Sequence, residues 1–456
     1  MVDPGGGRDA RVTNDGSWPS PARAWYGVAV FTLALTFNAI DRQIMNLLVG
    51  PIKHDLAISD TQMSLLLGFS YAVFSAVAGI PIARLADVHS RRLIIGIGIV
   101  GWSTMTAACG IAQNYWQLFL ARVGVGVGDA CNAPATFSIL ADSFPKETLP
   151  KATSVISMGF MLGSGISLIV GASVIQLVAG TPYVHLPLIG EVRSWQLVFI
   201  IVGAPGLLIA ALMSTVQEPR RRGVMHADTG AGRPRALPVR EILRFMAREW
   251  KTYAPIFLTL GLRAMLGFGI IVWLPSFFIR TYGWSPSQIG YIQGLILIFV
   301  APAGLFCGGW LAGWFTRRGY MDANIRVVLL ACMAIAPCAA IFPLMPDPGL
   351  AVGLYALYTF LAYFSPGPQN AALQIVTPNQ MRAQVTAMFI LVFNLVGFGI
   401  GPTFIAVFTD YVLGDESLLR YSLALGGIVL APLAALSTWY GMKPYAESVM
   451  RAEARE

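Results

Sequence analysis

Apolar segments of about 20 residues recur along the whole chain and are separated by short polar stretches. A helix of this length crosses the hydrocarbon core of a bilayer, and only helices or closed barrels leave no backbone polar group unpaired in lipid. We therefore predict an all-α integral membrane protein with twelve transmembrane helices, at residues 25–49, 62–85, 93–112, 116–141, 152–179, 195–216, 254–279, 288–313, 325–345, 350–373, 383–410 and 420–441.

The composition excludes an ordinary soluble domain. Charged residues make up 12% of the 456 residues and hydrophobic residues 56%, whereas soluble domains carry about 25% charged residues. The net charge of +8 does not indicate a nucleic-acid partner, because the basic residues lie between apolar segments and form no basic domain. The first 24 residues lack the apolar core of a signal peptide, so the first apolar segment is expected to be retained.

Basic residues are distributed unevenly between the two sides of the predicted helices. Of the 31 Lys and Arg residues, 24 lie in or beside the two tails and the loops that follow the second, fourth, sixth, eighth and tenth segments. Four lie on the other side, namely Lys53, Arg193, Arg280 and Arg420. Because cytoplasmic loops are enriched in Lys and Arg, both termini are predicted to be cytoplasmic. We expect a multi-pass protein of the cell inner membrane.

The two halves of the chain resemble each other. Four residues at the end of the second apolar segment and just beyond it match four at the end of the eighth, at one constant offset: Leu85, Ala86, Arg91 and Arg92 match Leu311, Ala312, Arg317 and Arg318. Such repeats are typical of transporters whose site lies between the repeats. The predicted organisation is a tail (1–24), a six-helix bundle (25–216), a linker (217–253), a pseudo-symmetric six-helix bundle (254–441) and a second tail (442–456).

The linker contains an amphipathic stretch. Five apolar side chains fall on one helical face and three arginines on another: Ile242, Leu243, Phe245, Met246 and Trp250 against Arg240, Arg244 and Arg248. This pattern predicts an interfacial helix on an anionic leaflet. A site that binds a protein partner is the alternative.

Four charged residues interrupt apolar segments at bilayer depth. Asp41 and Arg42 lie in the first segment, and Arg122 and Asp129 share one helical face of the fourth. A charge at this depth costs about 2.5–3.5 kcal/mol, so intramembrane ionisable residues usually have a function. Asp41 and Asp129 are predicted proton carriers. The arginines, which stay charged, are predicted to pair with them across helices, Asp41 with an arginine of the fourth segment and Asp129 with Arg42, or to bind substrate. A static ion-pair network that fixes helix packing is the alternative.

Other candidate substrate-binding residues are Asn132 and Arg263. Arg263 is a further intramembrane cation, for which snorkelling to the interface is the alternative to substrate contact. The second half has few charges but many aromatic residues, including Trp273, Phe277, Tyr355 and Tyr358. This division fits an amphiphile whose head binds in one half and whose tail lies in the other.

A polar motif after the second segment predicts a cytoplasmic gate formed by Asp87, Arg91 and Arg92, with Arg382 as a partner for the acid. Asp87 near the start of a neighbouring helix would be stabilised by the helix dipole. Ordinary anchoring by positive charge explains Arg91 and Arg92 when each is taken alone.

The motifs of several other protein classes are missing from the chain. The four histidines are scattered and form no metal cluster. No phosphate-binding Gly-x-x-x-x-Gly-Lys-Ser/Thr and no Gly-x-Ser-x-Gly hydrolase motif occurs. We therefore expect neither an enzyme nor a resident cofactor, and the proton gradient is the predicted energy source.

The motifs that the chain does contain resemble those of the major facilitator superfamily. Leu85, Ala86, Asp87, Arg91 and Arg92 match its hallmark Gly-x-Leu-Ala-Asp-x-x-Gly-Arg-Arg. Two stretches, Asn38-Ala-Ile-Asp-Arg-Gln43 and Arg122-Val-Gly-Val-Gly-Val-Gly-Asp-Ala130, are similar to the spinster family of lipid transporters. In that family Glu is expected where this chain has Asp129, which is shorter by one methylene.

The resemblance implies the major facilitator fold and proton-coupled transport of amphiphilic lipids by alternating access. Lysophospholipids or sphingoid-phosphate-like molecules would be the substrates, and the lipid bilayer the main partner of a monomer. Transport of soluble organic anions or drugs is the alternative. A nontransporting receptor or a lipid scramblase is a further class, which two buried acids disfavour because a scramblase needs no proton carrier.

Overall fold

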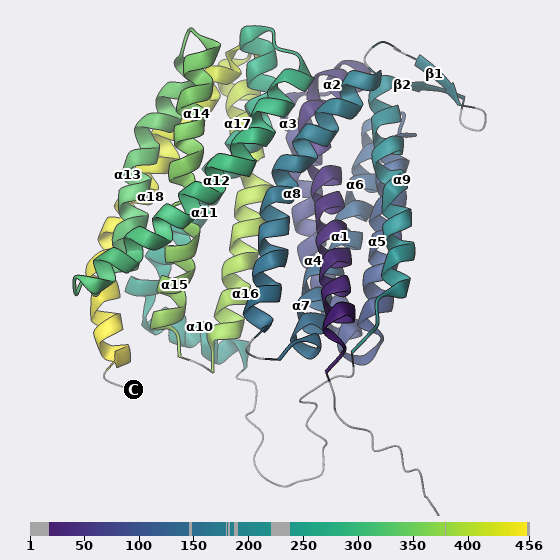
Figure 1. Cartoon of the computed structure of the whole chain (residues 1–456). Helices are drawn as coiled ribbons and strands as arrows, with labels where there is room; N and C mark the ends of the chain where they lie inside the picture. Colours follow the sequence, from purple (N-terminus) through teal and green to yellow (C-terminus); the bar gives the residue numbers. More distant parts are fainter. Residues whose placement is uncertain are drawn as a thin grey trace, which may run out of the picture.

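The computed structural model describes residues 18–145, 148–178, 180, 183–186, 190–219, 238–378 and 380–453, which are almost entirely helical (Figure 1). The first half contains α1 Pro21–Leu47, α2 Val49–Leu56, α3 Asp60–Ser64, the π-helix η1 Leu65–Phe69, α4 Ser70–Val88, α5 Arg91–Cys109, α6 Tyr115–Asp129, α7 Asn132–Ser143, α8 Leu149–Val178 and α9 Ser194–Thr215. A hairpin of β1 Tyr183–Leu186 and β2 Gly190–Arg193 joins the last two helices.

The second half begins with α10 Val239–Arg248, α11 Trp250–Tyr282, α12 Pro286–Arg317 and α13 Ala323–Ile341. It continues with the 3-10 helix η2 Phe342–Leu344, α14 Pro348–Ala362, α15 Pro366–Val376, α16 Arg382–Val392, the π-helix η3 Phe393–Ile400 and α17 Gly401–Val407. It ends with the π-helix η4 Phe408–Leu413, the 3-10 helix η5 Glu416–Leu418 and α18 Leu419–Glu453.

Eleven helical stretches among the described residues are long and apolar enough to span a membrane. They coincide with eleven of the predicted segments. The predicted fourth segment, 116–141, is instead divided between α6 and α7, because the helix breaks at Ala130 and Cys131. The last helix also continues to Glu453, so the segment predicted as a tail from residue 442 is helical over most of its length. The hairpin before α9 was not predicted.

Helix packing follows the same plan in both halves. In the first half α1 packs on α8 and α5 on α9, whereas in the second half α11 packs on η3 and α17, and α13 on α18. These are the first-with-fifth and third-with-sixth pairings of each half, counted by predicted segment. The repeated packing supports the internal duplication that the matching residues indicate, and we call the two halves the first and the second bundle.

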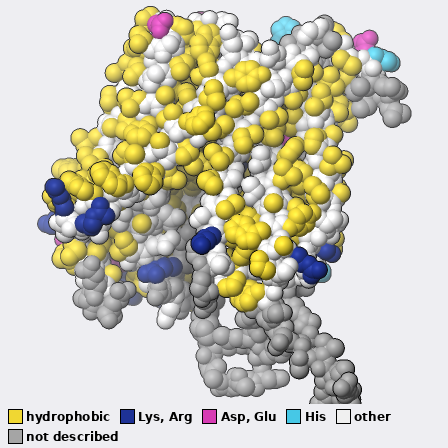
Figure 2. All heavy atoms as spheres, viewed as in Figure 1, with side chains coloured by type: hydrophobic (Ala, Val, Ile, Leu, Met, Phe, Trp, Pro, Cys, Tyr) yellow, Lys and Arg dark blue, Asp and Glu magenta, His cyan; other side chains and the backbone are white. Residues whose placement is uncertain are grey.

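The two ends of the molecule differ in charge. The described chain begins and ends at the same end, where Lys and Arg side chains gather, while Asp, Glu and His side chains are visible at the other (Figures 1 and 2). We call these the basic end and the opposite end. Hydrogen bonds between bundles, as far as the structure describes them, lie toward the opposite end and include Ser173–Tyr291 (3.0 Å), Ser64–Thr403 (3.2 Å) and Thr61–Asp410 (2.6 Å). The bundles are therefore joined at the opposite end.

The amphipathic linker helix α10 packs against the second bundle. Ile242 is fully buried, and the Phe245 ring lies 5.8 Å from that of Tyr253 in an edge-on contact. Leu243 and Trp250 are half exposed. α10 therefore covers most of the amphipathic stretch, and protein buries Ile242 on its apolar face. Contact of this helix with an anionic leaflet stays a prediction.

Candidate transport site

Asp41 and Arg122 lie together in the interior of the first bundle. Arg122 is fully buried, and its guanidinium donates from Nη1 to the backbone carbonyl of Asp41 (3.3 Å) and from Nε to that of Leu66 (3.5 Å). The Asp41 side chain is 3% exposed, and its Oδ1 has no hydrogen-bond partner among the described residues. The predicted partner of Asp41 in the fourth segment, Arg122, thus contacts the backbone carbonyl of Asp41, and the structure describes no hydrogen bond between Arg122 and the Asp41 carboxylate.

Asp129 and Arg42 meet at Tyr71 of α4. The Tyr71 hydroxyl donates to Oδ2 of Asp129 in a short hydrogen bond. The Arg42 guanidinium lies over the Tyr71 ring, 5.5 Å from its centroid, and its charge acts on Asp129. A tyrosine therefore stands between the predicted partners Asp129 and Arg42.

Two features of α6 place Asp129. A side chain at Gly126 would lie 2.8 Å from the backbone oxygen of Tyr71, so only glycine permits this approach of α4 to α6. Asp129 is the last residue of α6, where the unpaired carbonyls of a helix disfavour a negative charge. Broken helices at membrane depth occur where they line a site. The break thus puts an acid at a position whose charge is costly.

Asn132 follows Asp129 by three residues, on the other side of the helix break. It is the first residue of α7, it is 1% exposed, and its Oδ1 accepts a hydrogen bond from Thr136 (3.2 Å). Its contact lies within its own helix, and it is absent from the lining of the cavity described next. Its role in substrate binding stays a prediction.

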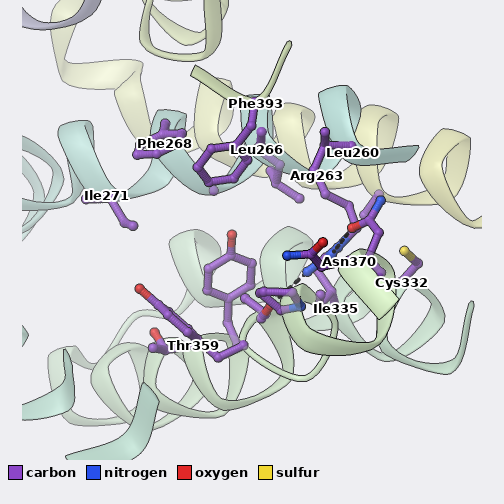
Figure 3. Close-up of a pocket in the computed structure, with 18 of the residues that line it drawn as sticks. Leu260, Arg263, Leu266, Phe268, Ile271, Cys332, Ile335, Thr359, Asn370 and Phe393 are labelled. Carbon is purple, nitrogen blue, oxygen red and sulfur yellow. Dashed lines mark hydrogen bonds between the residues drawn. The ribbon is translucent and has the colours of Figure 1, made fainter. Parts of the chain in front are cut away.

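A cavity with a volume of about 330 Å³ lies within the second bundle (Figure 3). Arg263 of α11 forms part of its wall and is held by Oε1 of Gln369 (3.1 Å) and the backbone carbonyl of Ala362 (2.7 Å). The lining is otherwise mainly apolar and aromatic, and includes Leu260, Leu266, Phe268, Ile271, Ile335, Tyr355, Tyr358, Tyr363, Phe389 and Phe393. One fixed cation in an apolar chamber can hold an anionic head beside an apolar tail.

The predicted gating arginines all bind protein groups at the basic end. Arg91 is 3% exposed and donates to Asp142 (2.5 Å) and Ser138, whereas Arg92 donates to the carbonyls that end α9. Arg382 donates to the carbonyls of Gln374 (2.9 Å) and Thr377 (3.1 Å). The Asp87 side chain lies outside the described residues, so its pairing stays a prediction.

Glu218 binds the first residues of the linker to the start of α5. Its carboxylate accepts hydrogen bonds from the Ser90 hydroxyl and from the backbone amide of Arg91 (2.8 Å). Partial burial alone would raise the pKa of Glu218, but these hydrogen bonds and the Arg91 charge outweigh it and lower the pKa below its ordinary value. Arg91 therefore holds the end of α7 and the start of the linker together.

A charge cluster at the opposite end was not predicted. Asp60 is fully buried and accepts a bidentate pair of hydrogen bonds from Arg280 (2.6 and 2.7 Å) and a short one from Lys53. Lys53 also pairs with Glu416 (2.5 Å). Lys53 and Asp60 belong to the first bundle and Arg280 and Glu416 to the second, so this cluster ties the bundles together.

Comparison with known proteins decides the family. A model of the Major Facilitator Superfamily matches residues 31–402. The chain belongs to this superfamily. It is 28% identical over 425 residues to an MFS-type efflux pump of Mycolicibacterium smegmatis, covering 91% of this chain and 90% of the relative. It is 24% identical over 414 residues to a probable L-galactonate transporter of Escherichia coli, covering 87% and 85%.

A solved structure connects this superfamily member to spinster. The crystal structure of a bacterial homologue of the human lysosomal transporter spinster, in an inward-facing and occupied conformation, aligns with a TM-score of 0.75. It shares 25% sequence identity and covers 96% of this chain and 98% of the homologue. The predicted resemblance to spinster is confirmed, and the chain is a multi-pass membrane transporter of the major facilitator type.

Proposed function

We propose that this chain is a proton-coupled secondary transporter of an amphiphilic anion. It would alternate access by rocking one bundle against the other, with α6 and α7 together forming the fourth of twelve spans and both termini in the cytoplasm of the cell. The excess of Lys and Arg at the basic end supports this orientation (Figure 2). Because the bundles are joined at the opposite end, the conformation described here would be open toward the cytoplasm.

The observation that carries the substrate class is the cavity at Arg263. Its wall supplies one fixed positive charge and an otherwise mainly apolar and aromatic surface. An arginine suits recognition of a phosphate or carboxylate, because its donors form a rigid fork. The apolar part of the chamber favours a substrate with a hydrocarbon tail, since buried apolar area is the main source of affinity.

Proton coupling rests on the two acids of the first bundle. An ionised Asp41 would leave a charged oxygen without a hydrogen-bond partner in a water-poor interior, which is costly. Asp129 stands at the end of a helix and within reach of the Arg42 charge, so movement of the helix end or of Arg42 changes its preference for a proton. Both acids can thus bind a proton in one conformation and release it in another.

The E. coli relative favours a second candidate, a soluble organic anion. A probable L-galactonate transporter is among the relatives, and Gln369 and Asn370 add polar groups near Arg263. A sugar acid would satisfy these groups but would leave the aromatic wall without an apolar partner. The two candidates therefore differ in what the apolar wall contributes to affinity.

A series of lysophosphatidylglycerols with tails of increasing length tests the proposal. Each buried methylene contributes about 0.8 kcal/mol, so affinity for the purified protein should rise up to about fourfold per methylene until the chamber is full. Arg263→Gln should weaken every member of the series and keep the slope with tail length. A flat series, together with binding of galactonate, would favour the soluble-anion candidate and contradict ours.

A further inference from the structure

One ring of the second bundle reaches the charged residues of the first. Phe398 lies in η3, and its ring stands 5.7 Å from the ring of Tyr71 and 5.2 Å beneath the Arg42 guanidinium. Arg42 thus lies over two rings, Tyr71 from its own bundle and Phe398 from the other. The interaction of a cation with aromatic faces, worth about 0.5–2 kcal/mol, connects the two bundles at this point.

The same ring also touches the wall of the cavity. Phe268 lines the cavity, and its ring makes an edge-on contact with Phe398 at 4.8 Å. Tyr71, on the other side of Phe398, donates its hydroxyl to Asp129. Continuous contacts therefore lead from the cavity through Phe268, Phe398 and Tyr71 to the acid.

The backbone at Phe398 is closely packed against the first bundle. A side chain at Gly68 of η1 would lie 2.1 Å from the carbonyl oxygen of Phe398, so η1 and η3 touch backbone to backbone. Both segments are π-helical, a conformation that is rare and often found at functional sites. Because close-packed contacts move in discrete steps, displacement of Phe398 must be shared by η1 and Tyr71.

We propose that Phe398 is a positioning residue that couples occupation of the Arg263 cavity to protonation of Asp129. The inference rests on the proposed function, because it assigns the contact through which substrate and proton communicate. A substrate tail in the cavity presses on Phe268 and shifts Phe398. The Arg42 guanidinium then leaves the Phe398 ring and moves nearer to Asp129. By thermodynamic linkage, protonation of Asp129 changes substrate affinity by the same factor.

Four charged or titratable groups among the described residues act on or respond to Asp129. Arg42 and Asp41 act from α1, Tyr71 acts from α4, and Cys131 follows in the turn after α6. The position of the Arg42 guanidinium is what changes with the state of the acid. Phe398 contacts both Arg42 and Tyr71 and is therefore placed to sense that position.

The test measures binding of lauroyl lysophosphatidylglycerol to the full chain in nanodiscs at about pH 5.5 and about pH 8.5. Its phosphodiester keeps one charge throughout this range, so any pH effect on affinity comes from the protein. For the unmodified protein we expect the two dissociation constants to differ about tenfold, a common size of coupling. In Phe398→Leu the two dissociation constants should differ by less than about twofold. The affinity at one of the two pH values should equal that of the unmodified protein.

Phe404→Leu is the matched control, because it removes a ring from the same predicted span whose described ring contact is with Phe408 and not with Arg42. Tyr71→Phe, which removes only the hydroxyl that binds Asp129, should reproduce the loss of pH dependence and replaces Phe398→Leu if that variant does not fold. Coupling retained in either folded variant, or lost equally in Phe404→Leu, overturns the inference. Affinity that ignores pH in the unmodified protein overturns the proton coupling itself.

Discussion

Replacing Asp41 by asparagine is expected to abolish proton-driven accumulation of substrate in proteoliposomes. Asparagine keeps the shape of the side chain in its buried site but cannot bind and release a proton. Uptake driven by a pH gradient should fall at least about tenfold, because the coupling free energy is lost with the carrier. Exchange of substrate without a gradient should continue, since Arg122 binds the backbone carbonyl of residue 41 and not its side chain.

The control for this experiment is Asp322→Asn. Asp322 pairs with Arg326 within one helical turn (3.0 Å), in the polar connection before α13. Its neutralisation should leave proton-driven uptake unchanged. Full uptake by Asp41→Asn would show that the acid only stabilises helix packing, which is the alternative that the sequence leaves open.

Replacing Asp60 by asparagine is expected to open the end of the molecule opposite to the termini. The substitution leaves Arg280 and the buried Lys53 without their shared carboxylate. Breaking a buried ion pair by removing one partner costs about 3–5 kcal/mol. A shift of that size is close to the roughly 5.5 kcal/mol that inverts a two-state population, so the conformation closed at this end should lose its majority.

Distances between spin labels at His54→Cys and Ser417→Cys measure this opening, since both positions are exposed and belong to different bundles. The labels should move apart in Asp60→Asn. They should not move in Asp415→Asn, because Asp415 accepts a hydrogen bond from the backbone amide of Ser417 within its own loop. An unchanged distance distribution in Asp60→Asn would mean that the other contacts at this end, such as the packing of α8 on α12, keep it closed without the cluster.

The helical segments were predictable because each one satisfies its own backbone hydrogen bonds and has a long apolar run. The break between α6 and α7 was not, because the residues at the break, Ala130 and Cys131, are as apolar as their surroundings. Hydropathy averaged over a span does not detect one interrupted turn. The π-helices η1 and η3 escaped prediction for the same reason, since they change hydrogen-bond pattern and not composition.

The candidate site was predicted in its components but not in its contacts. Asp41, Arg42, Arg122 and Asp129 stood out because charge is rare in apolar segments. The intervening Tyr71 did not, because a tyrosine in a helix is unremarkable until its hydroxyl is seen to reach a carboxylate. Arg263 was recognised as a buried cation, whereas its partner Gln369 lies 106 positions away.

The cluster around Asp60 shows the same limit. Asp60 and Arg280 are 220 positions apart and both stand at the ends of predicted spans, where charges ordinarily face water. One available signal was the shortage of cations on this side: Lys53 and Arg280 are two of only four. A Lys or Arg on the side of the membrane that carries few cations is therefore a candidate for a buried ion pair.

The burial of Asp60 determines how the closed end responds to salt. Mobile ions screen exposed charges over a Debye length of about 8 Å at physiological ionic strength, but they screen buried pairs much less. Asp60 is fully buried and Arg280 is 17% exposed, whereas Glu416 is 54% exposed. An increase in the salt concentration would thus weaken the Lys53–Glu416 contact and leave the Asp60–Arg280 pair nearly unchanged. The molecule would keep this end shut in dilute and in salty media alike.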